Sequence, residues 1–299
     1  MILAAIDIGS NAGRLLITEA APYADGTVDY IKLALLRVPL RLGVDVFSKG
    51  YISDEKIEQF IDTLKVYKLM MKIYKVEGFR ACATSAMRDA ANGPEILKRI
   101  KEETGIDISI ISGREEASVI YETHIAESLS LNKSYLYIDV GGGSTELTLF
   151  DKNEVVFKES FNIGTIRLLQ NSVSDSQWDA MKAFVKAGVK NHGPVEAIGT
   201  GGNINKVFSL SKRKMGKPLP LQLLRDYYKE LSAATFEERM HRYNLRADRA
   251  DVIVPALQVY VSVMRWAGAD EIFVPQIGLA DGLIKMQYRE ISEARARKS

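Results

Sequence analysis

Two carboxylates and a run of glycines lie close together near the middle of the sequence. Residues 135–140 are apolar apart from Asp139 and predict a buried strand, and residues 147–150 predict a second strand directly after Glu146. The turn between these strands begins with three glycines, Gly141, Gly142 and Gly143, which have no Cβ to keep a ligand away from the backbone N–H groups. It continues with two hydroxyl residues, Ser144 and Thr145. Carboxylates hold a hard cation such as Mg²⁺, and backbone amides hold phosphate. The segment therefore predicts a phosphate-and-metal site, with a plain glycine-rich hairpin as the alternative when the segment is considered alone.

The same order of residue types occurs near the N-terminus. Residues 2–8 predict a strand that carries Asp7, and Ser10 and Asn11 lie in the turn before a second strand over residues 14–20. Ala-Ile-Asp-Ile-Gly-Ser in this segment aligns with Tyr-Ile-Asp-Val-Gly-Gly in the later one, 132 residues further along. This separation is too long for a solenoid repeat, so it predicts two similar domains that face each other.

A third glycine-rich turn follows a short strand predicted over residues 195–198 and precedes a predicted helix. A strand, a glycine turn and a helix N-terminus in this order form an anion site through backbone geometry alone. The motif is weak by itself, but it is the third glycine turn in one chain. Its residues are Gly199, Thr200, Gly201 and Gly202.

Two segments between the hairpins carry further candidate groups. Arg88 comes soon after a strand predicted over residues 79–84, at the end of the strand where ligands gather in open α/β sheets. Glu115 and Glu116 lie in the first turn of a helix predicted from Ser112. Both acids could simply stabilise the helix dipole, or one of them could take part in chemistry. The local pattern leaves this choice open.

Length and composition indicate a two-domain protein that works in a reducing compartment. A chain of 299 residues exceeds one ordinary core, and the polar stretch at residues 129–133 is the predicted boundary, giving domains of residues 1–128 and 129–299. The last helix is an exception, because it could pack back on the first domain. Residues 44–50 are expected to form a polar loop, and the single Cys82 excludes a disulfide within the chain.

Charge and hydropathy exclude several classes of partner. The net charge of +2 is not the footprint of a DNA-binding protein. No apolar run approaches the length of a membrane span, and the N-terminus lacks the positive region of a signal peptide. These features predict a cytoplasmic protein without a membrane partner. The basic loop at residues 212–217 is either a solvated loop or a guide for a polyanion.

Duplicated hairpins with acid and glycine turns resemble the actin, Hsp70 and sugar kinase superfamily. The resemblance implies two ribonuclease H-like α/β domains with an interdomain cleft. Several segments together resemble the exopolyphosphatase and guanosine pentaphosphate phosphatase family in its short two-domain form: Asp7-Ile-Gly-Ser-Asn11, Ala83-Thr-Ser-Ala-Met-Arg-Asp89, Ile111-Ser-Gly-Arg-Glu-Glu-Ala117, Ile138-Asp-Val-Gly-Gly-Gly-Ser-Thr-Glu-Leu147, Gly199-Thr-Gly-Gly202, Arg246-Ala-Asp248 or Arg249-Ala-Asp251, and Gly278-Leu-Ala-Asp-Gly282.

This resemblance implies an enzyme that releases orthophosphate from inorganic polyphosphate, from guanosine pentaphosphate, or from both. It implies Mg²⁺ as the cofactor, with Mn²⁺ as a substitute and K⁺ as an activator, and a homodimer as the assembly. Glu116 matches the general base that activates water, and Arg88 matches the arginine that binds phosphate near the scissile bond. Asp139, Glu146 and Asp7 match the acids linked to the metal. The remaining matches are phosphate-loop positions: Ser10, Asn11, Gly141, Gly142, Gly143, Ser144, Thr145, Gly199, Thr200, Gly201 and Gly202.

The chain also departs from the family pattern. Ala12 and Gly13 replace the usual serine and bulky residue, so the first phosphate loop lacks a hydroxyl. Long members of the family carry a further helical domain that handles long polyphosphate, and this sequence ends after the two-domain core. Two other functions are weighed: an ATP-dependent small-molecule kinase of the same fold, and a non-catalytic sensor of polyphosphate or of the alarmone.

Overall fold

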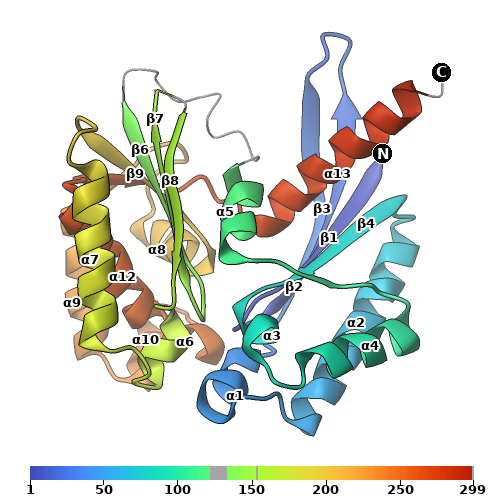
Figure 1. Ribbon diagram of the computed structural model, residues 1–299, viewed down its shortest axis with the longest axis horizontal. Helices are drawn as coiled ribbons and strands as arrows, with labels where there is room; N and C mark the ends of the chain where they lie inside the picture. The colour runs from blue at the N-terminus through green and yellow to red at the C-terminus, as the bar shows by residue number, and fades with distance from the viewer. Residues whose placement is uncertain (122–132, 153, 298–299) are drawn as a thin grey trace. The chain divides into compact units, whose positions relative to one another are not determined.

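The computed structural model describes residues 1–121, 133–152 and 154–297. The chain divides into two compact units, one formed by Met1–Thr123 with Gly278–Ser299 and the other by His124–Ile277. Residues 129–132 of the predicted connector lie outside the described residues. The last helix, α13 (Leu279–Ala296), belongs to the first unit (Figure 1).

The first unit contains a five-stranded sheet in the order β3-β2-β1-β4-β5. Its strands are β1 (Ile2–Ile8), β2 (Gly13–Pro22), β3 (Val28–Val38), β4 (Gly78–Ala83) and β5 (Ser109–Ile110). The first three strands are antiparallel neighbours, and β4 and β5 continue the sheet in parallel with β1. The helices are α1 (Leu42–Lys49), α2 (Asp54–Ile73), α3 (Ser85–Asp89), α4 (Gly93–Thr104), α5 (Gly113–Tyr121) and α13.

The central strand β1 is buried on both faces of its sheet. Ala4, Ile6 and Ile8 pack with the apolar sides of α2 and α4 on one face. Leu3 and Ala5 pack with α5 and α13 on the other face. Because side chains alternate along a strand, Asp7 belongs to the face on which α5 lies.

The second unit repeats this plan with a six-stranded sheet in the order β10-β11-β9-β6-β7-β8. Its strands are β6 (Ser134–Val140), β7 (Thr145–Asp151), β8 (Glu154–Phe161), β9 (Val195–Thr200), β10 (Leu219–Pro220) and β11 (Glu271–Phe273). The hairpin β6–β7–β8 is antiparallel, and β9 and β11 extend the sheet in parallel, as β4 and β5 do in the first unit. The two sheets thus confirm the predicted duplication of an α/β domain.

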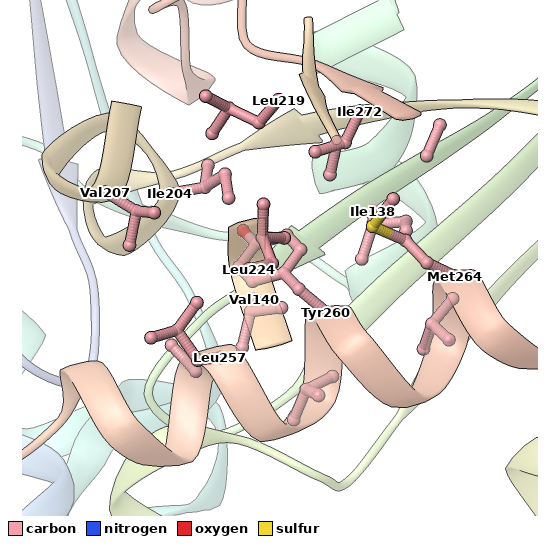
Figure 2. Close-up of a cluster of buried hydrophobic side chains, with 14 of the residues drawn as sticks. Ile138, Val140, Ile204, Val207, Leu219, Leu224, Leu257, Tyr260, Met264 and Ile272 are labelled. Atoms are coloured by element: carbon pink, nitrogen blue, oxygen red, sulfur yellow. The ribbon is translucent and has the colours of Figure 1, made fainter. Parts of the chain in front are cut away.

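Helices cover the second sheet and close its core. They are α6 (Thr165–Leu169), α7 (Asp175–Val189), α8 (Gly202–Ser211), α9 (Leu221–Ala233), α10 (Phe236–Arg242), α11 (Ala247–Ala250) and α12 (Ile253–Ala267). Figure 2 shows Tyr260 of α12 in the same cluster as Ile138 and Val140 of β6 and Ile204 and Val207 of α8. Burial of this cluster fixes the ends of β6 and β9, from which the glycine turns emerge.

The prediction of a polar loop at residues 44–50 is wrong, because Leu42–Lys49 form α1. Arg41 in the left-handed region (φ 52°) precedes this helix, and Gly50 (φ 83°) ends it. Leu42 and Val46, one turn apart, are its buried apolar residues. Two turns are too few for helical periodicity to be recognised from the sequence alone.

Candidate active site

The turns of the two hairpins share one hydrogen-bonding pattern. In each turn the first glycine donates its N–H to the carbonyl three residues later, from Gly9 to Ala12 (3.1 Å) and from Gly141 to Ser144 (2.9 Å). A segment that leads into a helix then donates to the carbonyls at the tip of the turn. In the first unit Gly43 N–H donates to the Ser10 carbonyl at 2.8 Å.

In the second unit the start of α6 holds the glycine turn. The backbone N–H groups of Thr165 and Ile166 donate to the carbonyls of Gly141 (3.0 Å) and Gly142 (2.8 Å). Arg167 Nε donates to the Gly143 carbonyl at 2.8 Å. These three bonds turn the carbonyls of the loop toward α6.

The same arrangement leaves N–H groups of the loop available to a ligand. Within the described residues, the N–H groups of Gly142 and Gly143 donate to no protein acceptor. Thr145, by contrast, uses its buried hydroxyl to donate to the Ile163 carbonyl (2.5 Å), which ties β7 to the segment before α6. Successive free N–H groups in a turn form a concave site for an anion.

Two carboxylates lie beside this turn. Asp139 of β6 and Glu146 of β7 are direct partners in the antiparallel ladder, so their side chains share one face of the sheet. Glu146 is 4% exposed and accepts a hydrogen bond from the Ser160 hydroxyl of β8 (3.0 Å). Among the described residues, no group of three or more His, Cys, Asp or Glu side chains could hold a metal. Two carboxylates with substrate and water oxygens are nevertheless a common way to bind Mg²⁺.

The third glycine turn ends β9 next to Asp139. Thr200 is the partner of Asp139 in the parallel ladder. Gly201 has φ +97°, and a Cβ there would come within 2.7 Å of Asp139 Oδ1. The buried Tyr260 hydroxyl donates to the Thr200 carbonyl (2.5 Å), and burial, followed by the charge of Asp139, raises the pKa of Tyr260 well above its usual value. Glycine at 201 and tyrosine at 260 thus fix the turn from two sides.

Two side chains at this turn could interact with an anion: Thr200, which the sequence predicted as a phosphate-loop residue, and Arg249. The buried Thr200 Oγ has no hydrogen-bond partner in the described part of the chain. Arg249 of α11 lies over the first turn of α8, and its Nη1 donates to Asn203 Oδ1 (3.3 Å). A side chain at Gly202 would clash with this guanidinium, because its Cβ would lie 2.9 Å from Nη1. A guanidinium beside a helix N-terminus favours an anion. The sequence offers two adjacent Arg-Ala-Asp segments and does not choose between Arg246 and Arg249.

The first unit places three of its polar groups at the carboxyl ends of β1 and β4. The buried hydroxyls of Ser10 and Ser85 are 2.8 Å apart. Arg88 of α3 donates from Nη1 to the Ile111 carbonyl (3.0 Å), directly after β5, and its Nε lies 3.7 Å from Asp89 Oδ1. The structure therefore brings Ser10, Ser85 and Arg88 together at one edge of the sheet.

The structure separates the roles of the two adjacent acids in α5. Ser112 N–H donates to Glu115 Oε2 (2.7 Å), and Glu115 N–H donates to Ser112 Oγ (3.2 Å). This reciprocal pair is a capping box, and the bond from the Ser112 backbone lowers the pKa of Glu115. The half-buried Glu116 lies on the next position of the helix. Glu115 is therefore the acid that stabilises the helix terminus, and a role for Glu116 in the chemistry stays a prediction.

Asp7 occupies the position in the first hairpin that corresponds to Asp139. Its ladder partner is Arg14, whose Nη1 donates to Asp7 Oδ2 at 2.5 Å. Cys82 pairs with Asp7 in the parallel ladder, and burial, with added repulsion from Asp7 and Glu116, raises the pKa of Cys82 to about 11. Cys82 is thus a buried, unreactive thiol, and a metal-binding role for Asp7 stays a prediction.

Comparison with known proteins agrees with the resemblance drawn from the motifs. The model of the Ppx/GppA phosphatase family matches residues 28–289. The chain belongs to the Ppx/GppA phosphatase family. A solved Ppx/GppA family member from Aquifex aeolicus is 26% identical, with a TM-score of 0.75, over 97% of this chain and 98% of that one. An exopolyphosphatase from Cytophaga hutchinsonii is 25% identical, with a TM-score of 0.82, over 96% and 97%.

A curated relative of this Ppx/GppA chain is a guanosine-5'-triphosphate,3'-diphosphate pyrophosphatase from Vibrio parahaemolyticus. It is 24% identical over 98% of this chain, and the match covers 60% of that protein. The chain therefore spans less than two thirds of the length of that relative. These likenesses confirm the family, and the solved members share the fold described above over nearly the whole chain. Among the described residues, no helix is long and apolar enough to cross a membrane.

Proposed function

We propose that this Ppx/GppA chain hydrolyses terminal phosphoanhydride bonds and releases orthophosphate from inorganic polyphosphate, from guanosine pentaphosphate, or from both. The observation that carries the proposal is the glycine turn of the second unit, whose carbonyls are held by α6 while the N–H groups of Gly142 and Gly143 stay free. Asp139 and Glu146 lie directly beside this turn. A phosphate with a bound cation satisfies both sets of groups.

In this proposal the second unit binds the phosphate groups. Thr200 Oγ, the N-terminus of α8 and Arg249 surround the other glycine turn, and they neutralise phosphate charge. Asp139 and Glu146 would hold Mg²⁺, or Mn²⁺ in its place, and the bound ion would supply positive charge beside the phosphate oxygens. Phosphoryl transfer requires mainly positioning and charge neutralisation, which these groups supply.

Glu116 is the group proposed to activate water, as the family resemblance implies. Glu116 is a half-buried carboxylate in the first turn of α5, directly after the capping acid Glu115. As a general base, Glu116 orients the water and takes its proton while the anhydride bond breaks. Arg88, fixed by the Ile111 carbonyl, binds a phosphate oxygen near the bond that is cut.

The substrate question is settled by measuring orthophosphate release from polyphosphate and from guanosine pentaphosphate side by side, with Mg²⁺ and K⁺ present. Release from at least one of them, with a terminal phosphate as the product, supports the proposal. No release from either would refute it.

Glu116→Gln and Glu115→Gln form a matched pair of variants that tests the general base. Glutamine preserves the capping box at position 115, so Glu115→Gln should keep near-normal turnover. Glu116→Gln should bind substrate normally but lose roughly 10²- to 10⁴-fold in kcat, the usual range for a missing general base. Equal turnover by the two variants would remove Glu116 from the mechanism.

A further inference from the structure

An acid-free segment connects the third glycine turn to the basic loop. Residues 197–225 contain no Asp or Glu, although the chain has 38 acids among its 299 residues. The segment contains six cations instead: Lys206, Lys212, Arg213, Lys214, Lys217 and Arg225. Such a segregation of charge is unusual in a chain whose basic and acidic residues are nearly balanced.

Helix α8 gives this charge a direction. Ile204, Val207 and Phe208 face the core, so the opposite side of α8 carries the exposed Ser209 and the half-buried Lys206, whose Nζ donates to the Asn244 carbonyl (3.3 Å). The helix begins at Gly202, beneath the Arg249 guanidinium, and ends at Ser211, directly before the basic loop. Its 10 residues span about 15 Å. A cationic track therefore runs from the candidate phosphate site along α8 to the basic loop.

The basic loop is ordered by its own hydrogen bonds. Arg213 Nη1 donates to the Pro218 carbonyl (2.9 Å), and Lys217 N–H donates to the Lys214 carbonyl (3.1 Å). Lys212, Lys214 and Lys217 are exposed, and within the described residues none of them pairs with a carboxylate. The helix dipole accounts for one cation at the end of α8, but not for Lys214 and Lys217 beyond it.

The chemistry of the track favours a chain of phosphates without bases. Proteins that bind single-stranded nucleic acid use exposed aromatic side chains on which bases stack. The only aromatic residue in residues 197–225 is Phe208, and it is 4% exposed. The track thus offers charge and no stacking surface. The cationic track ends where β10 pairs with β11, because the first residue of β11, the exposed Glu271, is an acid.

We infer that the exposed side of α8 and the loop at residues 212–217 bind the distal part of a long inorganic polyphosphate whose terminal phosphate lies at the glycine turn of residues 199–202. The inference rests on the proposed function and deepens it. It makes long polyphosphate the preferred substrate over guanosine pentaphosphate, whose short phosphate chain ends before the loop.

The test compares two triple variants that each lose three positive charges in the second unit. K212Q/K214Q/K217Q removes the exposed lysines of the loop and keeps Arg213, which orders it. K182Q/K186Q/K190Q removes three exposed lysines at α7 and its C-cap and serves as the control. Orthophosphate release is measured from long polyphosphate and from tripolyphosphate over a range of salt concentrations.

The loop variant should lose about tenfold in kcat/KM on long polyphosphate at low salt, as expected for three weak ionic contacts. A plot of log kcat/KM against log salt concentration should have a slope that is smaller in magnitude by about 2 for the loop variant. Each of the three lost charges should contribute about 0.7 to this slope, as for single-stranded nucleic acid. Tripolyphosphate, which is shorter than α8, should be cleaved as by the wild type. Equal losses in both triple variants, or a loop variant with unchanged kinetics on long polyphosphate, would overturn the inference.

Direct binding of long polyphosphate, measured by calorimetry, separates this inference from the proposed function. Weaker binding by the loop variant than by the α7 variant supports the track even if the wild type hydrolyses none of the substrates, in which case only the proposed function fails. Equal affinities of the two variants would refute the track whatever the activity.

Discussion

Gly164 lies directly behind the glycine turn of the second unit and offers a sharp test of how that turn is held. A Cβ at position 164 would lie 2.5 Å from the Gly142 carbonyl carbon and in closer overlap with Gly143. Ordinary contacts begin near 3.4 Å, so Gly164→Ala must move the turn or α6 by about 1 Å to relieve the closer overlap with Gly143. Displacements of about 1 Å in a catalytic site can cost roughly 10²-fold in rate.

We therefore expect Gly164→Ala to lower kcat/KM for orthophosphate release by about 10²-fold. Overpacking also costs about 1–3 kcal/mol of stability, so the melting temperature should fall by several degrees while the protein stays folded at 25 °C. Gly278→Ala is the matched control, because a Cβ at 278 meets nothing within 4 Å and the backbone there is extended. Activity of Gly164→Ala within about threefold of the wild type would refute the argument that α6 positions the turn.

Three further predictions concern packing, titration and the metal. Gly282→Ala places a Cβ of α13 against the Val119 carbonyl of α5, so calorimetry should show about 1–3 kcal/mol less stability; an unchanged melting temperature would contradict this packing. Hydrogen bonds from His192 and then Ser134 lower the pKa of Asp151, so Ser134→Ala should raise that pKa in an NMR titration. Because the pKa of Asp151 is lower in the folded protein, its ionised carboxylate stabilises the fold at pH values above the pKa of the unfolded chain, about 4. This stabilisation is lost as the pH falls through the pKa of the folded protein. The difference in melting temperature between Ser134→Ala and the wild type should therefore vanish in acid, and a difference that stays constant with pH would exclude this linkage. EDTA should stop phosphate release, and added Mg²⁺ should restore it. Asp139→Asn should need an at least about tenfold higher Mg²⁺ concentration for half-maximal activity than the control Asp151→Asn, which lies at the other end of the same hairpin. Full activity in EDTA would rule out a metal at Asp139.

The hairpins were predictable from the sequence because their information is local. An acid, a glycine turn and flanking apolar runs specify strand, turn and strand within about 15 residues, and the ladders of β1–β2 and β6–β7 follow this reading. The capping role of Glu115 was also readable, since Ser112 three residues earlier completes the capping box.

The remaining features depend on contacts between distant segments. Gly164 lies against Gly142 and Gly143, which are 22 and 21 positions earlier, and Arg249 lies over Gly202, 47 positions earlier. No local pattern specifies either contact, because each depends on where the core of the second unit, which includes Ile163 and Ala250, places a helix. The short helix α1 was missed for a related reason, since its ends are set by the left-handed residues Arg41 and Gly50 rather than by a long apolar repeat.

The duplicated hairpins show why equal motifs need not have equal roles. Both place an aspartate two residues before the first glycine of the turn, but the residue across the ladder is Arg14 in the first unit and Glu146 in the second. The guanidinium of Arg14 already neutralises Asp7 at 2.5 Å, and a cation bound to Asp7 would have to compete with it. Two carboxylates opposite each other repel, and a divalent cation relieves that repulsion. The identity of this single cross-strand partner therefore favours the second hairpin as the metal site, and Arg14→Glu is the substitution that would make the first hairpin match it.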